Sequence, residues 1–447
     1  MNNIIASNQI TLIVGLGLTG VSVARFLARE GRRFFVADES PHAERLGLFR
    51  QEFPDVQVLV GELDFEAWSG VSEIVLSPGV PRANRAIAKA IEQGVPVIGD
   101  VELFRRAAKA PLVAITGSNG KTTVTALVGA MAREAGCKVK VGGNIGIPCL
   151  DLLDETCELY VLELSSFQLE SIGSLGASVA SILNLSADHL DRYSSFQDYY
   201  QAKQKIYLGA KAIVANKDDA LTQALLAQGV RQSSFGANKP DLKDYGLIHE
   251  DGSVFLAKGL QKLLNVEELK IKGKHNQLNA LAALAIGEAS GLQLDSMITT
   301  LKGFEGLPHR CQFVARVNDV EFYNDSKATN AGAAIAAVTG FAQPLILIAG
   351  GDAKGGDFSD FAMKLPSNLK MIITIGVDGP KIYQACAEHF HCLSADSLKE
   401  AVGLAAENSA SGDAIILSPA CASLDMFKNY QDRGQQFVEA VEALCTL

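Results

Sequence analysis

The chain consists of short apolar runs that each end in a polar or glycine-rich loop and lead into a segment with helical spacing of apolar residues. The first run, at residues 9–16, precedes a helix-like segment through Val23 and Leu27, and a second run follows at residues 33–37. Continuous apolar runs of this length are typical of strands buried in a parallel sheet. Their alternation with helices predicts an α/β fold.

These signals fall into three successive groups, and each group predicts one α/β domain. We place the domains at residues 1–99, 100–306 and 307–447. A chain of 447 residues is too long for one ordinary hydrophobic core, which agrees with this division. We expect a Rossmann-like first domain, a P-loop ATPase-like central domain and a Rossmann-like third domain.

The most informative loop reads T-G-S-N-G-K-T-T over residues 116–123, between an apolar run and a helix-like segment. Glycines allow backbone N–H groups to converge on phosphate oxygens, and a helix N-terminus adds positive potential. Lys121 can reach the β- and γ-phosphates, and the Thr122 hydroxyl can ligate Mg²⁺. Ile115 occupies the position of the first glycine in the usual pattern, so the loop is a shortened variant. Its candidate ATP-binding residues are Gly117, Ser118, Asn119, Gly120, Lys121, Thr122 and Thr123.

A second glycine loop, G-L-G-L-T-G at residues 15–20, follows the first apolar run, and Asp38 ends the second run. By pattern this is a dinucleotide-binding fingerprint with an acid for the ribose. A nicotinamide or flavin dinucleotide and another nucleotide-like anion remain open alternatives for this loop.

Several polar residues stand where a ligand site of a parallel sheet would lie. Glu163 and His189 follow apolar runs, so both are candidates for metal binding or proton transfer; a turn or structural role is the alternative. On spacing alone, Lys203 is an ordinary surface lysine of a helix over residues 196–208. Asn276 and Asn279 share a helix face, where they can read an adenine edge or cap the helix.

Three loops of the third group gather Lys, Thr, Ser and Asp at strand exits, which suits recognition of a small polar anion. These loops are residues 324–330, 349–357 and 418–425.

Composition narrows the partners and the compartment. The net charge of −10 argues against a nucleic-acid partner. The eight cysteines show no C-x-x-C pair or zinc spacing, and reduced thiols fit a cytoplasmic protein. The N-terminus lacks the features of a signal peptide, and no apolar run approaches the length of a membrane span.

Taken together, the motifs resemble the Mur ligases of peptidoglycan synthesis. The matching segments are residues 116–123, G-G-N at 142–144, E-L-S-S at 163–166, D-H-L-D at 188–191, H-N at 275–276, L-P-H-R at 307–310 and N-D-S-K-A-T-N at 324–330. The resemblance implies an ATP-dependent amide ligase that works through an acyl phosphate. The first glycine loop, G-G-D with Lys354, and L-S-P-A-C-A-S at 417–423 are most similar to members that add D-glutamate to UDP-N-acetylmuramoyl-L-alanine.

The resemblance also assigns expected roles by position. It implies catalytic roles for Lys121, Glu163, His189 and Lys203, with Lys203 carrying a carbamate. It implies two Mg²⁺ sites held by Thr122, Glu163, His189 and Lys203. Adenine, phosphates and ribose would face Asn276, Asn279, Arg310 and Asp325. The UDP-substrate would contact Gly17, Leu18, Thr19, Asp38, Ser77, Gly79, Asn144 and His189. D-glutamate would contact Lys327, Thr329, Lys354, Ser423, Leu424 and Tyr430.

Two positions depart from the D-glutamate-adding pattern. Glu39-Ser40 replaces a Thr-Arg pair beside the uridine, and Tyr430 replaces a phenylalanine. Two rival functions remain at this stage: a folylpolyglutamate-type ligase, which would lack the first α/β domain, and a nucleotide-dependent redox or sensor protein. We expect a monomer with small-molecule substrates that serves cell-wall synthesis, cell shape and cell division.

Overall fold

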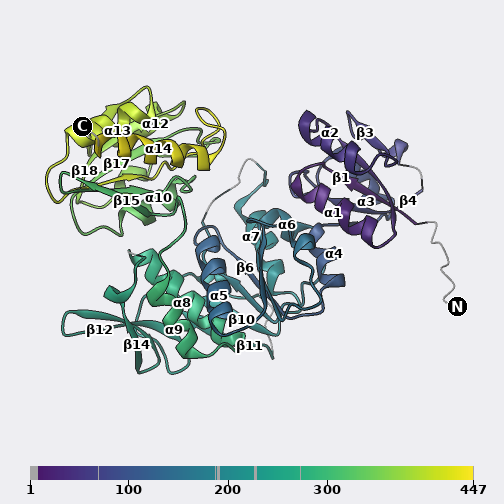
Figure 1. Ribbon diagram of the computed structural model, residues 1–447, viewed down its shortest axis with the longest axis horizontal. Coiled ribbons are helices and arrows are strands. Elements are labelled where there is room, and N and C mark those ends of the chain that lie inside the picture. Colours follow the sequence, from purple (N-terminus) through teal and green to yellow (C-terminus); the bar gives the residue numbers. More distant parts are fainter. Residues whose placement is uncertain are drawn as a thin grey trace. The chain divides into compact units, whose positions relative to one another are not determined.

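The computed structural model describes residues 9–445, apart from residues 69, 187, 189–191, 226–228 and 272. Figure 1 shows three β-sheets with their flanking helices, coloured along the sequence. By its internal contacts the chain divides into two compact units. The first unit comprises Met1–Leu247, Ala257–Gln261 and Leu281–Thr300. The second comprises Ile248–Leu256, Lys262–Ala280 and Leu301–Leu447.

The first sheet is parallel, with strand order β3-β2-β1-β4-β5. Its strands are β1 (Ile10–Val14), β2 (Arg33–Asp38), β3 (Val58–Val60), β4 (Val71–Leu76) and β5 (Val97–Ile98). Its helices are α1 (Leu18–Arg29), α2 (Ala43–Glu52), α3 (Arg85–Glu92) and the 3₁₀ turn η1 (Phe65–Ala67). The strand order reverses at β1, and a crevice at the carboxyl ends of the strands follows from such a reversal.

The central sheet has the order β14-β13-β12-β11-β10-β9-β6-β8-β7, and its pairs from β7 to β12 are parallel. Its strands are β6 (Leu112–Thr116), β7 (Val139–Gly143), β8 (Leu159–Glu163), β9 (Val179–Ile182), β10 (Ala212–Asn216), β11 (Arg231–Phe235), β12 (Tyr245–Glu250), β13 (Ser253–Lys258) and β14 (Gln261–Asn265). The helices are α4 (Asp100–Ala107), α5 (Lys121–Glu134), α6 (Ser166–Glu170), α7 (Phe196–Gln204), α8 (Lys274–Ala289) and α9 (Leu294–Gly303). Short 3₁₀ turns are η2 (Cys149–Leu152), η3 (Lys205–Tyr207), η4 (Ala220–Thr222) and η5 (Val266–Glu268).

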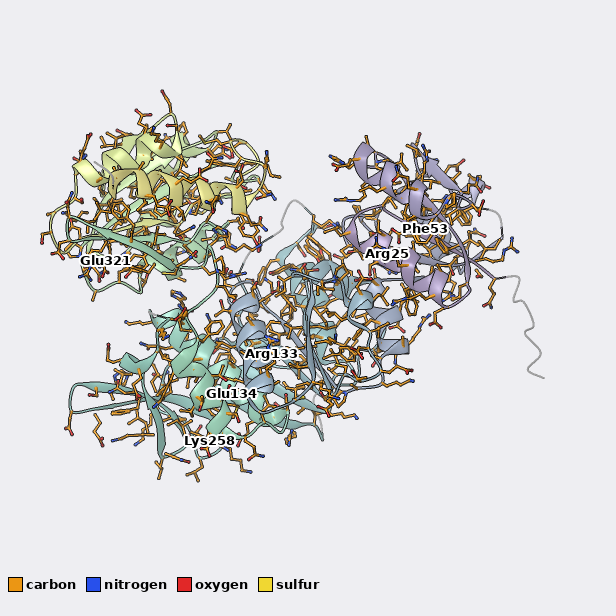
Figure 2. All side chains as sticks on the ribbon, in the orientation of Figure 1. Arg25, Phe53, Arg133, Glu134, Lys258 and Glu321 are labelled. Carbon is orange, nitrogen blue, oxygen red and sulfur yellow. The ribbon has the colours of Figure 1, made fainter. Side chains whose placement is uncertain are left out.

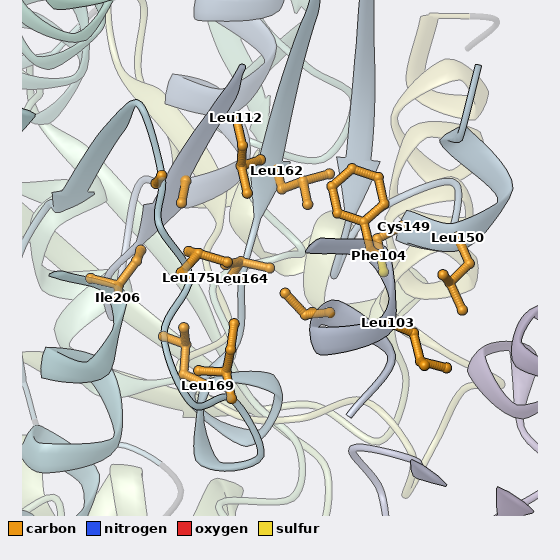
Figure 3. Packing of buried hydrophobic residues seen from close by; sticks show 14 of the residues in the cluster. Leu103, Phe104, Leu112, Cys149, Leu150, Leu162, Leu164, Leu169, Leu175 and Ile206 are labelled. Atoms are coloured by element: carbon orange, nitrogen blue, oxygen red, sulfur yellow. The ribbon is translucent and has the colours of Figure 1, made fainter. Parts of the chain in front are cut away.

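One buried apolar cluster supports the carboxyl ends of the central strands. Figure 3 shows Leu162 and Leu164, from the end of β8 and the residue beyond it, among the side chains of this cluster. The ring of Phe104 on α4 meets Tyr160 on β8 edge-on, with centroids 4.9 Å apart. Burial of this apolar surface, at about 25 cal/mol per Å², fixes β8 and therefore Glu163 at its end.

The third sheet has the order β15-β16-β20-β17-β18-β19, with only the β15–β16 pair antiparallel. Its strands are β15 (Gln312–Val317), β16 (Val320–Asn324), β17 (Leu345–Gly350), β18 (Leu369–Ile375), β19 (His391–Ser394) and β20 (Ala414–Leu417). Its helices are α10 (Ala331–Val338), α11 (Phe361–Lys364), α12 (Gly379–Cys386), α13 (Leu398–Glu407) and α14 (Tyr430–Cys445). Asn318 and Asp319, with φ of 49° and 64°, form the turn between β15 and β16.

The α/β class is confirmed, whereas the domain boundaries at residues 99/100 and 306/307 stay a prediction. The predicted helix over residues 196–208 is wrong in its second part, because α7 ends at Gln204 and tightens into η3. Arg25 lies on the surface, where it forms an ion pair with Glu52 (Figure 2). None of the helices formed by the described residues has both the length and the apolar character of a membrane span.

Candidate active site

In the first glycine loop, two glycines lie in tight backbone packing and a third has free space around it. Gly15 has φ +95°, and a Cβ there would lie 2.8 Å from Cβ of Ser77. A Cβ on Gly20 would lie 2.0 Å from the carbonyl oxygen of Gly15, so α1 packs directly on the loop. A Cβ on Gly17 would meet no heavy atom within 4 Å, which leaves the backbone there accessible to a ligand.

This loop opens onto a cavity of about 420 Å³. The cavity brings together seven of the eight residues predicted for the UDP-substrate: Gly17, Leu18, Thr19, Asp38, Ser77, Gly79 and Asn144. The eighth, His189, lies outside the described residues. Asp38 is already engaged, because its two oxygens accept from the backbone N–H groups of Leu16 at 2.5 Å and Ser40 at 2.8 Å.

The cavity is linked to a buried carboxylate at the end of β8. Nδ2 of Asn144 donates to Oε1 of Glu163 at 2.8 Å. Glu163 is 2% exposed, and its Oε2 has no hydrogen-bond partner among the described residues. A buried, unpaired carboxylate oxygen is costly unless a proton or a cation occupies it. Glu163 therefore fits a metal ligand.

The phosphate loop adopts the expected strand–loop–helix geometry. Gly120, with φ +80°, is the N-cap of α5, which begins at Lys121. Nζ of Lys121 donates to the carbonyl oxygens of Gly117 at 2.8 Å and Ser118 at 2.9 Å. The loop therefore keeps its cation at the place where anionic oxygens would bind.

Neighbouring segments brace this loop through residues that the sequence motifs do not indicate. Asn184 accepts from the N–H of Asn119 at 2.8 Å and donates to its carbonyl oxygen at 3.0 Å. The hydroxyls of Ser118 and Tyr199 lie 2.9 Å apart, and Ser118 Oγ also accepts from the N–H of Ser186 at 2.9 Å. The only sequence signal for Asn184 is its position at a strand exit.

Lys203 is buried beneath the loop, so the expectation of a surface lysine from spacing alone is wrong. Its side chain is 2% exposed, and Nζ donates to Oγ1 of Thr116 at 3.1 Å and to the carbonyl oxygen of Gly117 at 3.0 Å. Burial, and next the positive charge of Lys121, hold the pKa of Lys203 well below its ordinary value. The hydrogen bond from Lys203 to Thr116 at the end of β6 joins two segments far apart in the sequence, which spacing along α7 cannot reveal.

The four residues predicted for adenine, phosphates and ribose lie in the second unit. Asn276 is buried, and its Oδ1 accepts from Nδ2 of Asn279 at 3.1 Å. Asp325 Oδ1 accepts from the N–H of Cys311 at 3.1 Å, and Oδ2 accepts from the hydroxyl of Ser418 at 2.8 Å. Burial raises the pKa of Asp325 to about 7. Arg310 lies between these groups in the sequence and is half-buried.

The residues predicted for D-glutamate lie on loops at the carboxyl edge of the third sheet, except Tyr430, which begins α14. Nζ of Lys327 lies 3.8 Å from the centroid of the Tyr430 ring, within cation–π distance. Ser423 is buried, whereas Thr329, Lys354 and Leu424 are exposed. Asp352 and Ala422 exchange two backbone hydrogen bonds of 3.0 and 2.7 Å, which join the loop of Lys354 to the loop of Ser423.

A buried arginine that the motifs do not indicate ties these loops together. Arg433 on α14 has no exposed surface and donates to Oγ of Ser326 at 3.0 Å and to its carbonyl oxygen at 2.8 Å. It also donates to the carbonyl oxygens of Cys421 at 3.1 Å and Ala422 at 3.2 Å. Burial lowers the pKa of Arg433 to about 10.

Three family descriptions match successive parts of the chain. "Mur ligase MurD-like, N-terminal domain" matches residues 9–99, "Mur ligase middle domain" matches 115–287, and "Mur ligase, glutamate ligase domain" matches 309–421.

Curated relatives match over the full length. The UDP-N-acetylmuramoylalanine--D-glutamate ligases of Pseudomonas fluorescens and Pseudomonas aeruginosa are each 50% identical over 446 residues, covering 99% of this chain and 100% of the relative. The ligase of the same name from Acinetobacter baylyi is 48% identical over 452 residues, with the same coverage.

Solved structures share the fold. A UDP-N-acetylmuramate-alanine ligase from Thermotoga maritima superposes with a TM-score of 0.60 at 20% identity, covering 97% of this chain and 99% of its own. A pseudomurein peptide ligase type C from Methanothermus fervidus gives 0.62 at 18% identity, covering 98% and 100%. Three domain descriptions match the chain, and full-length relatives are 50% identical to it. The chain therefore belongs to the Mur ligase family.

Proposed function

We propose that this protein is an ATP-dependent ligase that adds D-glutamate to UDP-N-acetylmuramoyl-L-alanine in peptidoglycan precursor synthesis. The observation that carries the proposal is the cavity in which seven predicted substrate residues meet, joined through Asn144 to the buried carboxylate of Glu163. The relatives named UDP-N-acetylmuramoylalanine--D-glutamate ligase are 50% identical over 99% of this chain, which supports the proposal that this protein uses the same substrates.

The reaction must activate a carboxylate, which is a poor electrophile. An oxygen of the L-alanine carboxylate attacks the γ-phosphorus of ATP, the bond to the β–γ bridging oxygen breaks, and ADP leaves. The amine of D-glutamate, having lost a proton, then attacks the carbonyl carbon of the acyl phosphate, and inorganic phosphate leaves as the amide forms. Phosphoryl transfer depends mainly on positioning and charge neutralisation.

The residues of the phosphate loop supply that positioning in the proposal. The backbone of Gly117–Thr123 surrounds the phosphates, and Lys121 exchanges its two carbonyl contacts for phosphate oxygens. Asn276 and Asn279 would read adenine. Arg310 would face the phosphates and Asp325 the ribose, although both carboxylate oxygens of Asp325 already accept hydrogen bonds.

The donor set fits Mg²⁺. Glu163 offers a buried oxygen that has no hydrogen-bond partner among the residues the structure describes, and Mg²⁺ prefers oxygen ligands. Thr122, His189 and a modified Lys203 would complete two metal sites. When bound, Mg²⁺ neutralises charge on the transferring phosphoryl group. Asn144 would keep Glu163 oriented through its 2.8 Å hydrogen bond.

We further propose that Lys203 carries a carbamate formed with CO₂. Only a neutral amine attacks CO₂, and burial beside Lys121 favours the neutral form of Lys203. The N–C bond forms as the amine loses a proton, and the product is an anionic oxygen ligand. A buried carbamate needs a cation beside it, which Lys121 and the metal sites would provide.

D-glutamate would be held by the loops that Arg433 joins. Lys327 and Lys354 supply cations for its two carboxylates, and Thr329 and Ser423 supply hydroxyl donors. Leu424 and the ring of Tyr430 would cover its methylene groups.

The protein would act as a monomer in the cytoplasm, with domains at residues 1–99, 100–306 and 307–447. The seven cysteines whose side chains are described are free thiols, which fits a reducing compartment. Through the peptidoglycan precursor it would serve cell-wall synthesis, cell shape and cell division.

Phosphate release tests the proposed function. With ATP, Mg²⁺ and UDP-N-acetylmuramoyl-L-alanine, we expect release that depends on D-glutamate and is at least about tenfold slower with L-glutamate. Equal rates with both enantiomers, or release without the UDP-substrate, would contradict the proposal.

A further inference from the structure

Arg192 contacts three consecutive carbonyl groups of a loop that lines the substrate cavity. Nη1 donates to the carbonyl oxygens of Pro78 at 3.1 Å and Gly79 at 3.3 Å, and Nη2 donates to that of Val80 at 3.1 Å. Pro78, Gly79 and Val80 line the cavity, whereas Arg192 is not among the lining residues. The guanidinium therefore contacts the loop without forming part of the cavity wall.

The same guanidinium is anchored on α6, which begins three residues after Glu163. Its central carbon lies 4.5 Å from the centre of the Phe167 ring, and Nη2 lies 3.6 Å from Oε2 of Glu170. The Arg192 side chain is only 14% exposed. A planar group with five donors can serve an aromatic face, a carboxylate and several carbonyls at once, which an ammonium cannot.

Other described contacts also fix the two ends of the loop at 78–80. Oγ of Ser77 donates to the carbonyl oxygen of Gly15 at 2.9 Å and ties the start of the loop to the first glycine loop. Beyond Val80, Nη1 of Arg82 donates to the carbonyl oxygen of Val97 at 3.1 Å and to Oγ of Ser171, the C-cap of α6, at 3.5 Å. Arg192 contacts residues 78–80 themselves and joins them to α6.

We infer that Arg192 is a positioning residue for the UDP-muramoyl substrate: it fixes the backbone of residues 78–80, which form part of the cavity wall. This inference rests on the proposed function. A wall held in its bound conformation costs less to order when ligand binds, so loss of Arg192 should weaken substrate binding. Its effect on the phosphate loop should be small, since none of its three carbonyl partners belongs to that loop.

The test compares Arg192→Met and Arg192→Lys with a matched control. Arg29→Met is the control, because Arg29 on α1 also donates across to the central part, to the carbonyl oxygen of Leu150 at 3.3 Å, but Leu150 does not line the cavity. Calorimetry without turnover measures the affinity for UDP-N-acetylmuramoyl-L-alanine and, separately, for a non-hydrolysable ATP analogue. Steady-state assays then give KM and kcat for each substrate.

We expect Arg192→Met to weaken UDP-substrate binding and raise its KM about tenfold or more. The affinity for the ATP analogue should stay within about twofold, as should both affinities of Arg29→Met. Arg192→Lys should be intermediate, because it keeps the charge beside Glu170 but cannot serve three carbonyls.

Wild-type-like UDP-substrate affinity in Arg192→Met would overturn the inference, and so would an equal loss for the ATP analogue. Should Arg192→Met fail to fold by circular dichroism, Arg192→Lys decides in the same way. A wild-type protein that binds the UDP-substrate but releases no phosphate with D-glutamate would contradict the proposed function and leave this inference standing.

Discussion

The first unit contains two glycine loops of the same plan and different surroundings. Both follow a buried parallel strand and open a helix, and both use glycine at positive φ, Gly15 at +95° and Gly120 at +80°. The first faces a cavity of about 420 Å³ that includes the carboxylate of Asp38. The second carries Lys121 and lies on the buried amine of Lys203.

The difference between the two loops matches the difference between binding a phosphate group and transferring one. Backbone N–H groups suffice to hold a diphosphate. Transfer requires charge that is fixed before the reaction, which Lys121, Glu163 and Lys203 would supply at the second loop. The backbone pattern therefore indicates an anion site, and side chains from other segments decide its chemistry.

Removing the cation of the second loop should have the largest effect. In Lys121→Ala we expect kcat to fall by about 10³-fold or more, because the charge acts on the transferring phosphoryl group. Binding of the UDP-substrate should be unchanged by calorimetry. Lys109→Ala is the control, since Lys109 is 79% exposed in its ion pair with Glu155. A near-normal kcat in Lys121→Ala would contradict the proposal that the second loop, unlike the first, takes part in phosphoryl transfer through a fixed charge.

Lys203→Ala tests the second loop further, because no described residue gives the first loop an equivalent buried amine. We expect kcat to fall by about 10²-fold or more. Wild type equilibrated with ¹³CO₂ should show a carbamate carbon by NMR that is absent in the variant and present in the control Lys211→Ala, a change at an exposed lysine. Full activity in Lys203→Ala would count against the carbamate.

The sequence was sufficient for features that depend on strand ends. The seven cavity residues and the phosphate loop all lie at or shortly beyond the carboxyl ends of strands, and parallel strands bring these ends to one edge. The sequence was insufficient for features that depend on tertiary packing, such as which face of a helix is buried and which distant residues it contacts. The burial of Lys203 and the contacts of Asn184, Arg192 and Arg433 depend on which segments return to one another, and no local pattern encodes this.

Gly17→Val tests the first loop. A Cβ at Gly17 would meet no heavy atom within 4 Å, so we expect the variant to fold, with its methyl groups in the cavity that Gly17 lines. We expect the KM for the UDP-substrate to rise about tenfold while the KM for ATP changes little. The control is Gly47→Val on α2, where a Cβ also meets no atom within 4 Å and which lies outside the cavity lining. An unchanged KM for the UDP-substrate would place the diphosphate elsewhere.

Ser118→Ala should give the smallest effect. It removes the contacts of the hydroxyl with Tyr199 and with the N–H of Ser186 but leaves every backbone donor of the loop. We expect the KM for ATP to rise about threefold, because the lost hydrogen bonds are neutral and lie within the protein rather than on the ligand, with UDP-substrate binding unaffected. A fall in kcat as large as that expected for Lys121→Ala would show that the hydrogen bonds of Ser118, and not the charge of Lys121, determine the activity of the loop.

Calorimetric titration of wild type, Gly17→Val and Lys121→Ala with UDP-N-acetylmuramoyl-L-alanine, a non-hydrolysable ATP analogue and NAD tests the division of labour between the loops most directly. We predict that wild type binds the first two ligands and not NAD, that Gly17→Val loses affinity only for the UDP-substrate, and that Lys121→Ala loses affinity only for the ATP analogue. NAD binding that disappears in Gly17→Val, without any UDP-substrate binding, would contradict the account.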